Sequence, residues 1–219
     1  MSEFLIFMMG ACLGSFLGLV VDRFPHTSII APRSHCSTCH HVLCIWDMIP
    51  IFSQLILGSR CRYCHRRLPI WYALFEAVCG FLIWQLYLGR LEFSFVCLVI
   101  LGLMLSLYDL RSQSYPVVIW LIGTLIFLPF THLNLTFAIC LLLAFFCECY
   151  EWRIGSGDLL FLASISLYLP LSSLVWLIQL ASSSALIYLI CQKQFRRSLP
   201  FVPFLYSAIL LLVLCQMGR

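Results

Sequence analysis

The chain has 219 residues, of which 63% are hydrophobic and only 10% are charged, and its mean hydropathy is +1.02. Soluble domains carry about 25% charged residues, so this composition excludes a soluble enzyme and indicates an integral membrane protein. The formal net charge of +4 decides little by itself, because its distribution along the chain matters more.

Apolar runs separated by short polar clusters predict an all-α integral membrane protein with eight transmembrane helices. The expected helices cover residues 4–22, 70–88, 93–108, 116–131, 137–150, 158–170, 174–191 and 201–217. Several of these runs are shorter than a straight span needs, so helix should continue into the polar stretches 109–115 and 151–157. The first run carries Glu3 where a signal peptide would have Lys or Arg, which predicts a retained helix.

The one sizeable polar insert divides the chain into three expected parts. These are a first transmembrane helix at 1–22, a cytoplasmic loop at 23–69 and a seven-helix membrane core at 70–219. With the insert in the cytoplasm, alternating spans place every Lys and Arg inside except Arg90 and Arg219, which agrees with the positive-inside rule. This topology puts both chain termini outside and turns the polar loops between later helices toward the cytoplasm.

Two CxxC pairs stand in the insert, Cys36 with Cys39 and Cys61 with Cys64. Two such pairs can complete a tetrahedral four-cysteine zinc site, which has no open position and therefore serves to fold the loop. Redox dithiols and free thiols stay open as alternatives, whereas disulfides are rare in the cytoplasm. A nearby side chain could also substitute for a cysteine as ligand, and the candidates are Cys44, His35, His40, His41 and His65.

Four acids lie in or near apolar segments, namely Glu76, Asp109, Glu148 and Asp158. An ionisable residue in a membrane span is costly unless it is paired or hydrated, so each is a candidate functional residue. Glu76 is expected to orient helices, to polarise a site or to be a partnered buried carboxylate, and Glu148 is expected to be structural.

Asp109 and Asp158 both fall at the cytoplasmic ends of expected helices, so they could face each other across a helical bundle. Two close carboxylates share a proton, which lets one act as a general base and the other as a general acid. Three alternatives stay open: a proton relay in a carrier, a helix cap at Asp158, and pairing of Asp109 with Arg111 or Arg153.

Taken in order along the chain, these motifs and several others resemble the type IV prepilin peptidases, a family of membrane leader peptidases with a GxGD aspartate. The shared motifs are Gly14-Ser15-Phe16 with Arg23 and Pro25, the two CxxC pairs, Asp47-Met48-Ile49-Pro50 with Ser53, Arg60 to Cys64, Pro69 to Glu76, Asp109-Leu110, Gly155-Ser156-Gly157-Asp158, and Leu199 to Phe204.

The resemblance implies an aspartyl endopeptidase of the bacterial cytoplasmic membrane that removes the basic leader of prepilin or pseudopilin proteins after a glycine, at the cytoplasmic face. By position, Asp109 and Asp158 match the family's catalytic aspartates, and the four cysteines match its zinc ligands. Lipid is the other expected partner, and no nucleic acid is expected.

Many members also methylate the new N-terminus with S-adenosylmethionine, so this second activity is implied as well. The chain departs from common family residues at Gly18, Val117 and Leu160. These departures leave peptidase chemistry intact and put methyl transfer in question. Two other function classes compete with the peptidase: a proton-coupled carrier that uses the two aspartates as a relay, and a non-catalytic scaffold that docks a partner on the zinc loop.

Overall fold

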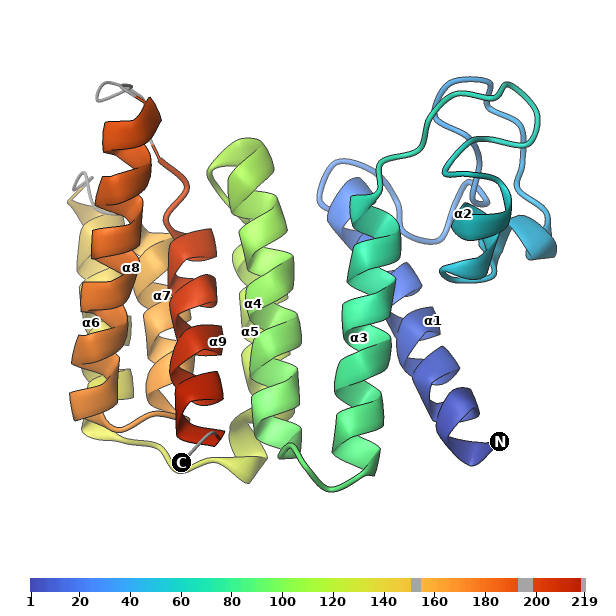
Figure 1. Cartoon of the computed structure of the whole chain (residues 1–219). Coiled ribbons are helices and arrows are strands. Elements are labelled where there is room, and N and C mark those ends of the chain that lie inside the picture. Colours follow the sequence, from blue (N-terminus) through green and yellow to red (C-terminus); the bar gives the residue numbers. More distant parts are fainter. Residues whose placement is uncertain (151–154, 193–198, 218–219) are drawn as a thin grey trace. The chain divides into compact units, whose positions relative to one another are not determined.

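A computed structural model of the chain describes residues 1–150, 155–192 and 199–217 (Figure 1). Secondary structure in these residues is helical, apart from two isolated β-bridges in the insert. The chain divides into two compact units, Met1–Glu92 and Phe93–Arg219, and each is described by itself. Five basic residues on which the predicted orientation depends lie outside the described residues: Arg153, Lys193, Arg196, Arg197 and Arg219.

All eight expected helices are found in the described part of the chain. They are α1 (Ser2–Arg23), α3 (Trp71–Tyr87), α4 (Phe93–Ser112), α5 (Val117–Phe127), α6 (Leu135–Cys149), α7 (Ser156–Ser166), α8 (Leu171–Gln192) and α9 (Val202–Met217). Among these residues α1, α4 and α8 are long and apolar enough to cross a membrane, while several other apolar helices are shorter. The membrane class of the chain is supported, and the expected eight crossings stay a prediction.

The expected helix boundaries shift where proline removes a backbone donor. The helix expected at 116–131 ends at Phe127 and continues as the 3₁₀ turn η2 (Leu128–Phe130), which contains Pro129. The helix expected at 158–170 ends at Ser166, before Pro170. Two other helices extend beyond their apolar runs, as predicted from the shortness of those runs. The helix α4 continues through Asp109 to Ser112, and α7 begins at Ser156.

In the first unit, α1 packs against α3 through glycines. A side-chain carbon at Gly14 would lie 2.9 Å from the Cα of Glu76, and one at Gly10 would lie 2.9 Å from the Cα of Gly80. Gly10 and Gly14 form a GxxxG pair, which allows two helix backbones to approach closely in a membrane. The insert leaves this hairpin where α1 ends and α3 begins, and it contains η1 (Ile45–Met48) and α2 (Phe52–Ile56) (Figure 1).

In the second unit, α4 packs against α5 and α9, α9 packs against α8, and α7 packs mainly against α6. Figure 1 shows α9 between α8 and α4. Buried polar bonds hold α7 to α5. The indole N–H of Trp120 donates to the Ser164 hydroxyl at 2.8 Å, and the Thr124 hydroxyl lies 2.9 Å from the same oxygen. These contacts fix the helix whose first turn carries Asp158.

Candidate functional site

The Asp109 side chain is buried near the end of α4 and is held by the start of α9. Its Oδ2 accepts a hydrogen bond from the Val202 backbone N–H at 3.0 Å, and the Phe201 N–H is a second partner. The first N–H groups of a helix have no partner within the helix, and they favour a negative charge. The start of α9 therefore stabilises a carboxylate at Asp109 and ties α4 to α9.

Asp158 lies in the first turn of α7, and its backbone N–H donates to the Gly155 carbonyl at 3.1 Å. A side-chain carbon at Gly155 would lie 2.9 Å from the Oδ2 of Asp158. A larger residue at position 155 would therefore displace the carboxylate. This first-turn position also suits a helix cap, the alternative role considered for Asp158.

Tyr115, in the connection between α4 and α5, reaches the same turn. Its hydroxyl donates to the Gly157 carbonyl at 2.5 Å, and a side-chain carbon at Gly157 would lie 2.9 Å from its Cε1. Burial raises the pKa of Tyr115, and the charges of Asp158 and Asp109 raise it further. Tyr115 consequently stays protonated, and its hydroxyl donates to the backbone of the turn that carries Asp158.

Asp109 and Asp158 line one cavity of about 370 Å³, together with Tyr115, Gly157 and Val202. The negative charge of Asp109 disfavours a second negative charge on Asp158 through space. The structure thus brings together the two aspartates selected from the sequence, which are 49 positions apart. In this arrangement backbone N–H groups at the start of α9 hold one carboxylate, and the second carboxylate lines the same cavity.

Sequence reasoning missed two parts of this site. It assigned no role to Tyr115, although this aromatic residue lies between Asp109 and a proline in a short connection. It also named the Leu199 to Phe204 motif without predicting that the amides at its centre bind Asp109. The motif's position just before an apolar helix is the signal that could have indicated an anion-holding helix start.

The two glutamates are partnered. Glu76 is buried in α3, where its Oε2 accepts the Ile51 N–H at 2.7 Å and Ser15 provides a second bond. Glu148, near the end of α6, accepts the Ser156 hydroxyl at 2.8 Å. Glu148 thereby supports the turn that carries Asp158, a contact that the sequence did not indicate.

The four cysteines of the insert form a separate cluster in the first unit. All four sulfur atoms lie within 4.8 Å of one another, with Cys36 to Cys64 at 3.7 Å and Cys39 to Cys61 at 4.0 Å. These distances are too long for disulfides. They are close to the roughly 3.8 Å edge of a tetrahedron around zinc with bonds of about 2.3 Å.

The two CxxC pairs fold in the same way, which supports a shared ion. In the first, Cys36 N–H donates to the His41 carbonyl and His40 N–H donates to the Cys36 carbonyl. In the second, Cys61 and His65 make the corresponding bonds, and both His40 and His65 have positive φ. The backbone N–H of Cys39 lowers the pKa of Cys36 to about 6, so that its thiolate predominates at neutral pH.

None of the alternative ligands belongs to this cluster within the described residues. The His41 ring packs on the Tyr63 ring at a tilt, with ring centres 3.6 Å apart, and the Cys44 sulfur lies 3.4 Å from the Tyr63 hydroxyl. The donor set that fits a zinc ion is therefore the one chosen from the sequence, Cys36, Cys39, Cys61 and Cys64.

Comparisons with known proteins give the family context. A family model described as the bacterial peptidase A24 N-terminal domain matches residues 8–90, which lie within the first unit. The "Prepilin leader peptidase/N-methyltransferase" of Myxococcus xanthus (strain DK1622) is 38% identical over 78 residues, 35% of this chain and 23% of that protein.

A second relative covers both units. The "Type 4 prepilin-like proteins leader peptide-processing enzyme" of Escherichia coli O78:H11 (strain H10407 / ETEC) is 27% identical over 233 aligned residues, 89% of this chain and 87% of that protein. No solved structure matches the chain. These matches confirm the resemblance to the type IV prepilin peptidases.

Proposed function

We propose, with this resemblance as the premise, that the chain is a membrane aspartyl endopeptidase that removes the leader peptide of type IV prepilin-like proteins. The observation that carries the proposal is the shared cavity of Asp109 and Asp158. The names of the relatives support leader processing as the activity. The proposed setting is a bacterial cytoplasmic membrane, crossed several times, with the cavity facing the cytoplasm and both termini outside.

The two aspartates have different surroundings, and we assign them different roles. Asp109 accepts backbone N–H groups, which favour its charged form, so it is the general base that takes a proton from water. The water oxygen forms a bond to the scissile carbonyl carbon. Asp158, next to the charge of Asp109, carries the shared proton and gives it to the leaving amide nitrogen as the C–N bond breaks.

The glycines of the cavity suit a peptide substrate with a small residue before the cut. Gly155 and Gly157 line the cavity without adding side chains to it, and a glycine before the cut would let the substrate backbone approach the two aspartates closely. The basic leader would approach the acidic pair while the following apolar helix of the substrate stays in the bilayer. With the leader in water and the apolar helix in the bilayer, the bond to be cut would lie at the membrane surface.

The four cysteines have a structural part in the proposal. A zinc ion bound by four thiolates has no open position for substrate or water, so its chemistry is to hold the two CxxC pairs together. Cleavage itself is assigned to the second unit. N-methylation of the new terminus by S-adenosylmethionine is proposed as a second activity, on the printed name of the Myxococcus relative.

The test is co-expression with a prepilin-like protein, followed by the N-terminal mass of the product. Wild type should cleave after the leader glycine, and Asp109→Ala and Asp158→Ala should both abolish cleavage. Glu92→Ala is the matched control, because Glu92 is an exposed carboxylate outside the cavity. The same spectrum shows whether a methyl group has been added.

Two outcomes would reject the peptidase. Absence of cleavage by well-expressed wild type, together with substrate accumulation that collapses with the proton gradient, would support the carrier instead. Full cleavage by both alanine variants would remove the aspartates from the chemistry.

A further inference from the structure

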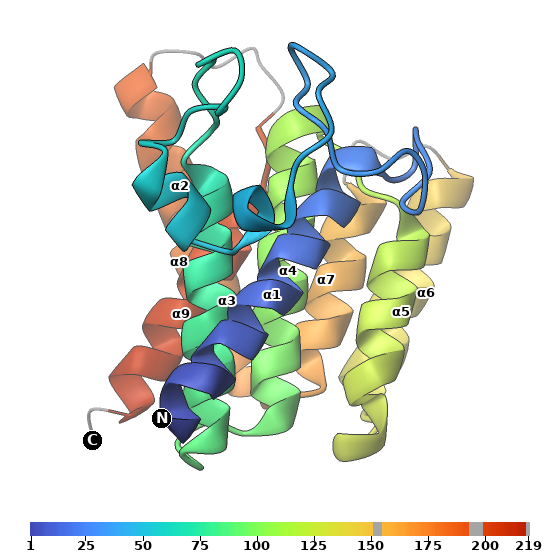
Figure 2. The same ribbon diagram turned by 90° about the vertical axis from the view of Figure 1, so that its right-hand side faces the viewer.

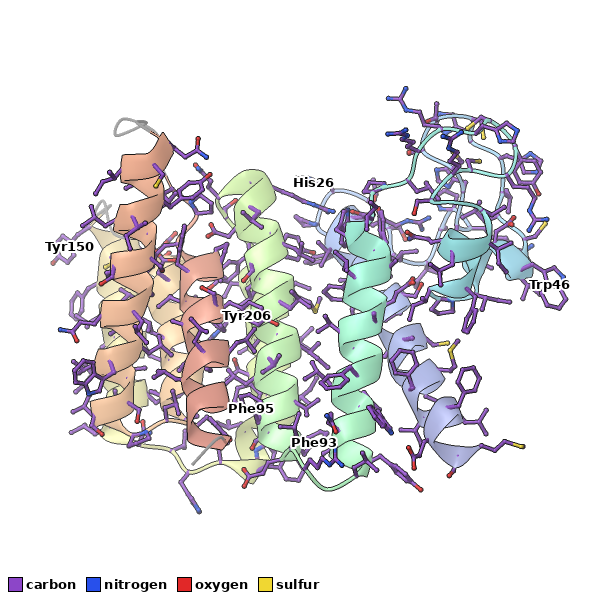
Figure 3. The ribbon with its side chains drawn as sticks, in the orientation of Figure 1. His26, Trp46, Phe93, Phe95, Tyr150 and Tyr206 are labelled. Atoms are coloured by element: carbon purple, nitrogen blue, oxygen red, sulfur yellow. The ribbon has the colours of Figure 1, made fainter. Side chains whose placement is uncertain are left out.

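Residues 45–56 of the insert, the loop apolar segment, present an unusual surface. Within this segment the one charged residue is Asp47, whose side chain is only 3% exposed and pairs with Arg62 at 2.7 Å. The large apolar side chains point outward instead: Ile45 is 79% exposed, Trp46 74%, Leu55 69% and Ile56 79%. Figure 3 shows Trp46 projecting from the insert. Large apolar side chains that gather exposed on one short segment indicate an interaction surface.

The loop apolar segment is attached to the side of the α1–α3 hairpin. The N–H of Ile51 donates to Glu76, which lies in the second turn of α3 rather than at its end. Ile51 has a φ of 63°, a conformation that a β-branched residue rarely adopts, and this turn directs its N–H to the carboxylate. Figures 1 and 2 both show α2 at the level of the first turns of α3.

Contact with α1 shows how far the segment reaches along that helix. The ring of Phe52 lies 6.3 Å from the ring of Phe4 in an edge-to-face arrangement. Phe4 belongs to the first turn of α1, a helix of 22 residues that is long and apolar enough to cross a membrane. At 1.5 Å per residue α1 is about 33 Å long, close to the hydrocarbon thickness of a bilayer. The segment therefore lies beside the body of a candidate span.

The backbone of the segment suits a lipid environment as well. Backbone N–H groups within it donate to backbone carbonyls: that of Asp47 to Cys44, that of Ser53 to Ile49 and that of Leu55 to Ile51. Non-spanning backbone at membrane depth must satisfy its polar groups within the protein. Tryptophan is also enriched where a bilayer meets water.

We propose that the loop apolar segment inserts into the lipid bilayer beside α1, with Ile45, Trp46, Leu55 and Ile56 against the lipid. The covering partner is lipid because the segment contacts α1 at Phe4, and the outer face of α1 is itself apolar and exposed at Leu5, Met9 and Leu13. The insert then has two environments, with the CxxC pairs in water and the segment between them in the membrane. This inference does not depend on the proposed peptidase activity.

The test uses the full chain in phosphatidylcholine and phosphatidylglycerol vesicles with one fluorescent noncanonical amino acid at position 46. Lipids with brominated acyl chains should quench most of its emission, while aqueous iodide should leave it nearly unchanged. The matched control carries the probe at Thr38, an exposed position between Cys36 and Cys39, where the two quenchers should have the opposite effects. Zinc content measures whether the insert is folded in each sample.

Two results would overturn the proposal in samples that retain zinc. Quenching of position 46 by iodide but not by brominated lipid would place the segment in water. Protection from both quenchers would mean that protein covers it. Because replacement of Trp46 could disturb the segment, the same measurement is repeated with the probe at Ile56, where the same pattern is expected.

Discussion

The Tyr115 hydroxyl donates a hydrogen bond to the Gly157 carbonyl, at 2.5 Å. The two residues come shortly after Asp109 and directly before Asp158, so this bond links the chain segments that carry the two carboxylates. The spacing of the aspartates therefore depends on a side chain from the α4–α5 connection as well as on helix packing.

Tyr115→Phe removes this bond and keeps the ring. Without the bond the turn before Asp158 is less firmly placed, and misplacement of a catalytic group by about 1 Å can cost roughly a hundredfold in rate. We expect leader cleavage to slow by about tenfold or more, mainly in kcat, with about 1 kcal/mol lost in stability. Initial rates and thermal melting measure both. Tyr150→Phe, at an exposed position, is the control and should match wild type.

Gly157→Ala addresses the same contact from the other side. The added carbon would lie 2.9 Å from Tyr115 Cε1, too close for the ring to keep its place. We expect a greater loss of cleavage than in Tyr115→Phe, measured in the same assay. Gly18→Ala is the control, since a carbon there meets its nearest neighbour at an ordinary 3.7 Å. Full activity in Gly157→Ala would show that the turn adapts and that the close approach is unimportant.

The helix pair of the first unit has its own test. Gly14→Leu would drive a side chain into the backbone of α3 near Glu76, and overpacking of this kind costs about 1–3 kcal/mol. We expect a lower melting temperature and faster proteolysis of the insert. Cys12→Leu places the same side chain on an exposed face of α1 and should have little effect. Equal melting of the two variants would argue against glycine packing as the basis of the hairpin.

Zinc content should be about one per chain, and Cys39→Ser should lower it. Cys12→Ser, outside the cluster, should retain the metal. Elemental analysis of purified protein decides between a zinc site and four free thiols. Well-folded wild type without zinc would contradict the assignment.

The same site predicts a pH dependence. Zinc binds the thiolate form of cysteine, so protonation competes with the metal. Within the cluster the pKa is lowered from 9.0 to about 6 at Cys36 and raised to about 11 at Cys64. We expect zinc retention to be constant from neutral to mildly alkaline pH and to fall as the pH drops below about 6. Dialysis at a series of pH values, followed by metal analysis, measures this. Unchanged retention at pH 5 would count against the role of Cys36.

Local features of the chain were predictable from sequence, because they depend on neighbours. Apolar runs gave the helices, and the two CxxC spacings gave the cysteine cluster. The errors at helix ends arose where Pro129 and Pro170 changed the last turn, although proline is a known helix terminator. The division into residues 1–22, 23–69 and 70–219 stays a prediction.

The partners of each aspartate could not be predicted in the same way. Asp109 and the amide that binds it are 93 positions apart, and Tyr115 and Gly157 are 42 apart. Such contacts are set by how α4, α7 and α9 pack, and apolar periodicity in one chain does not specify which helices are neighbours. The two acids could be paired from their places at helix ends, whereas the only indication of the groups that hold Asp109 was the position of the Leu199 to Phe204 motif before an apolar helix.

The attachment of Asp109 to the start of α9 has a consequence for biosynthesis. Asp109 and Asp158 are both translated well before Phe201 and Val202. The backbone amides of these two later residues complete the surroundings of Asp109. A nascent chain inserted as far as α8 thus holds an unfinished centre, and only docking of the last helix finishes it. Under the proposed function, activity would then arise only after the last helix has been integrated into the membrane.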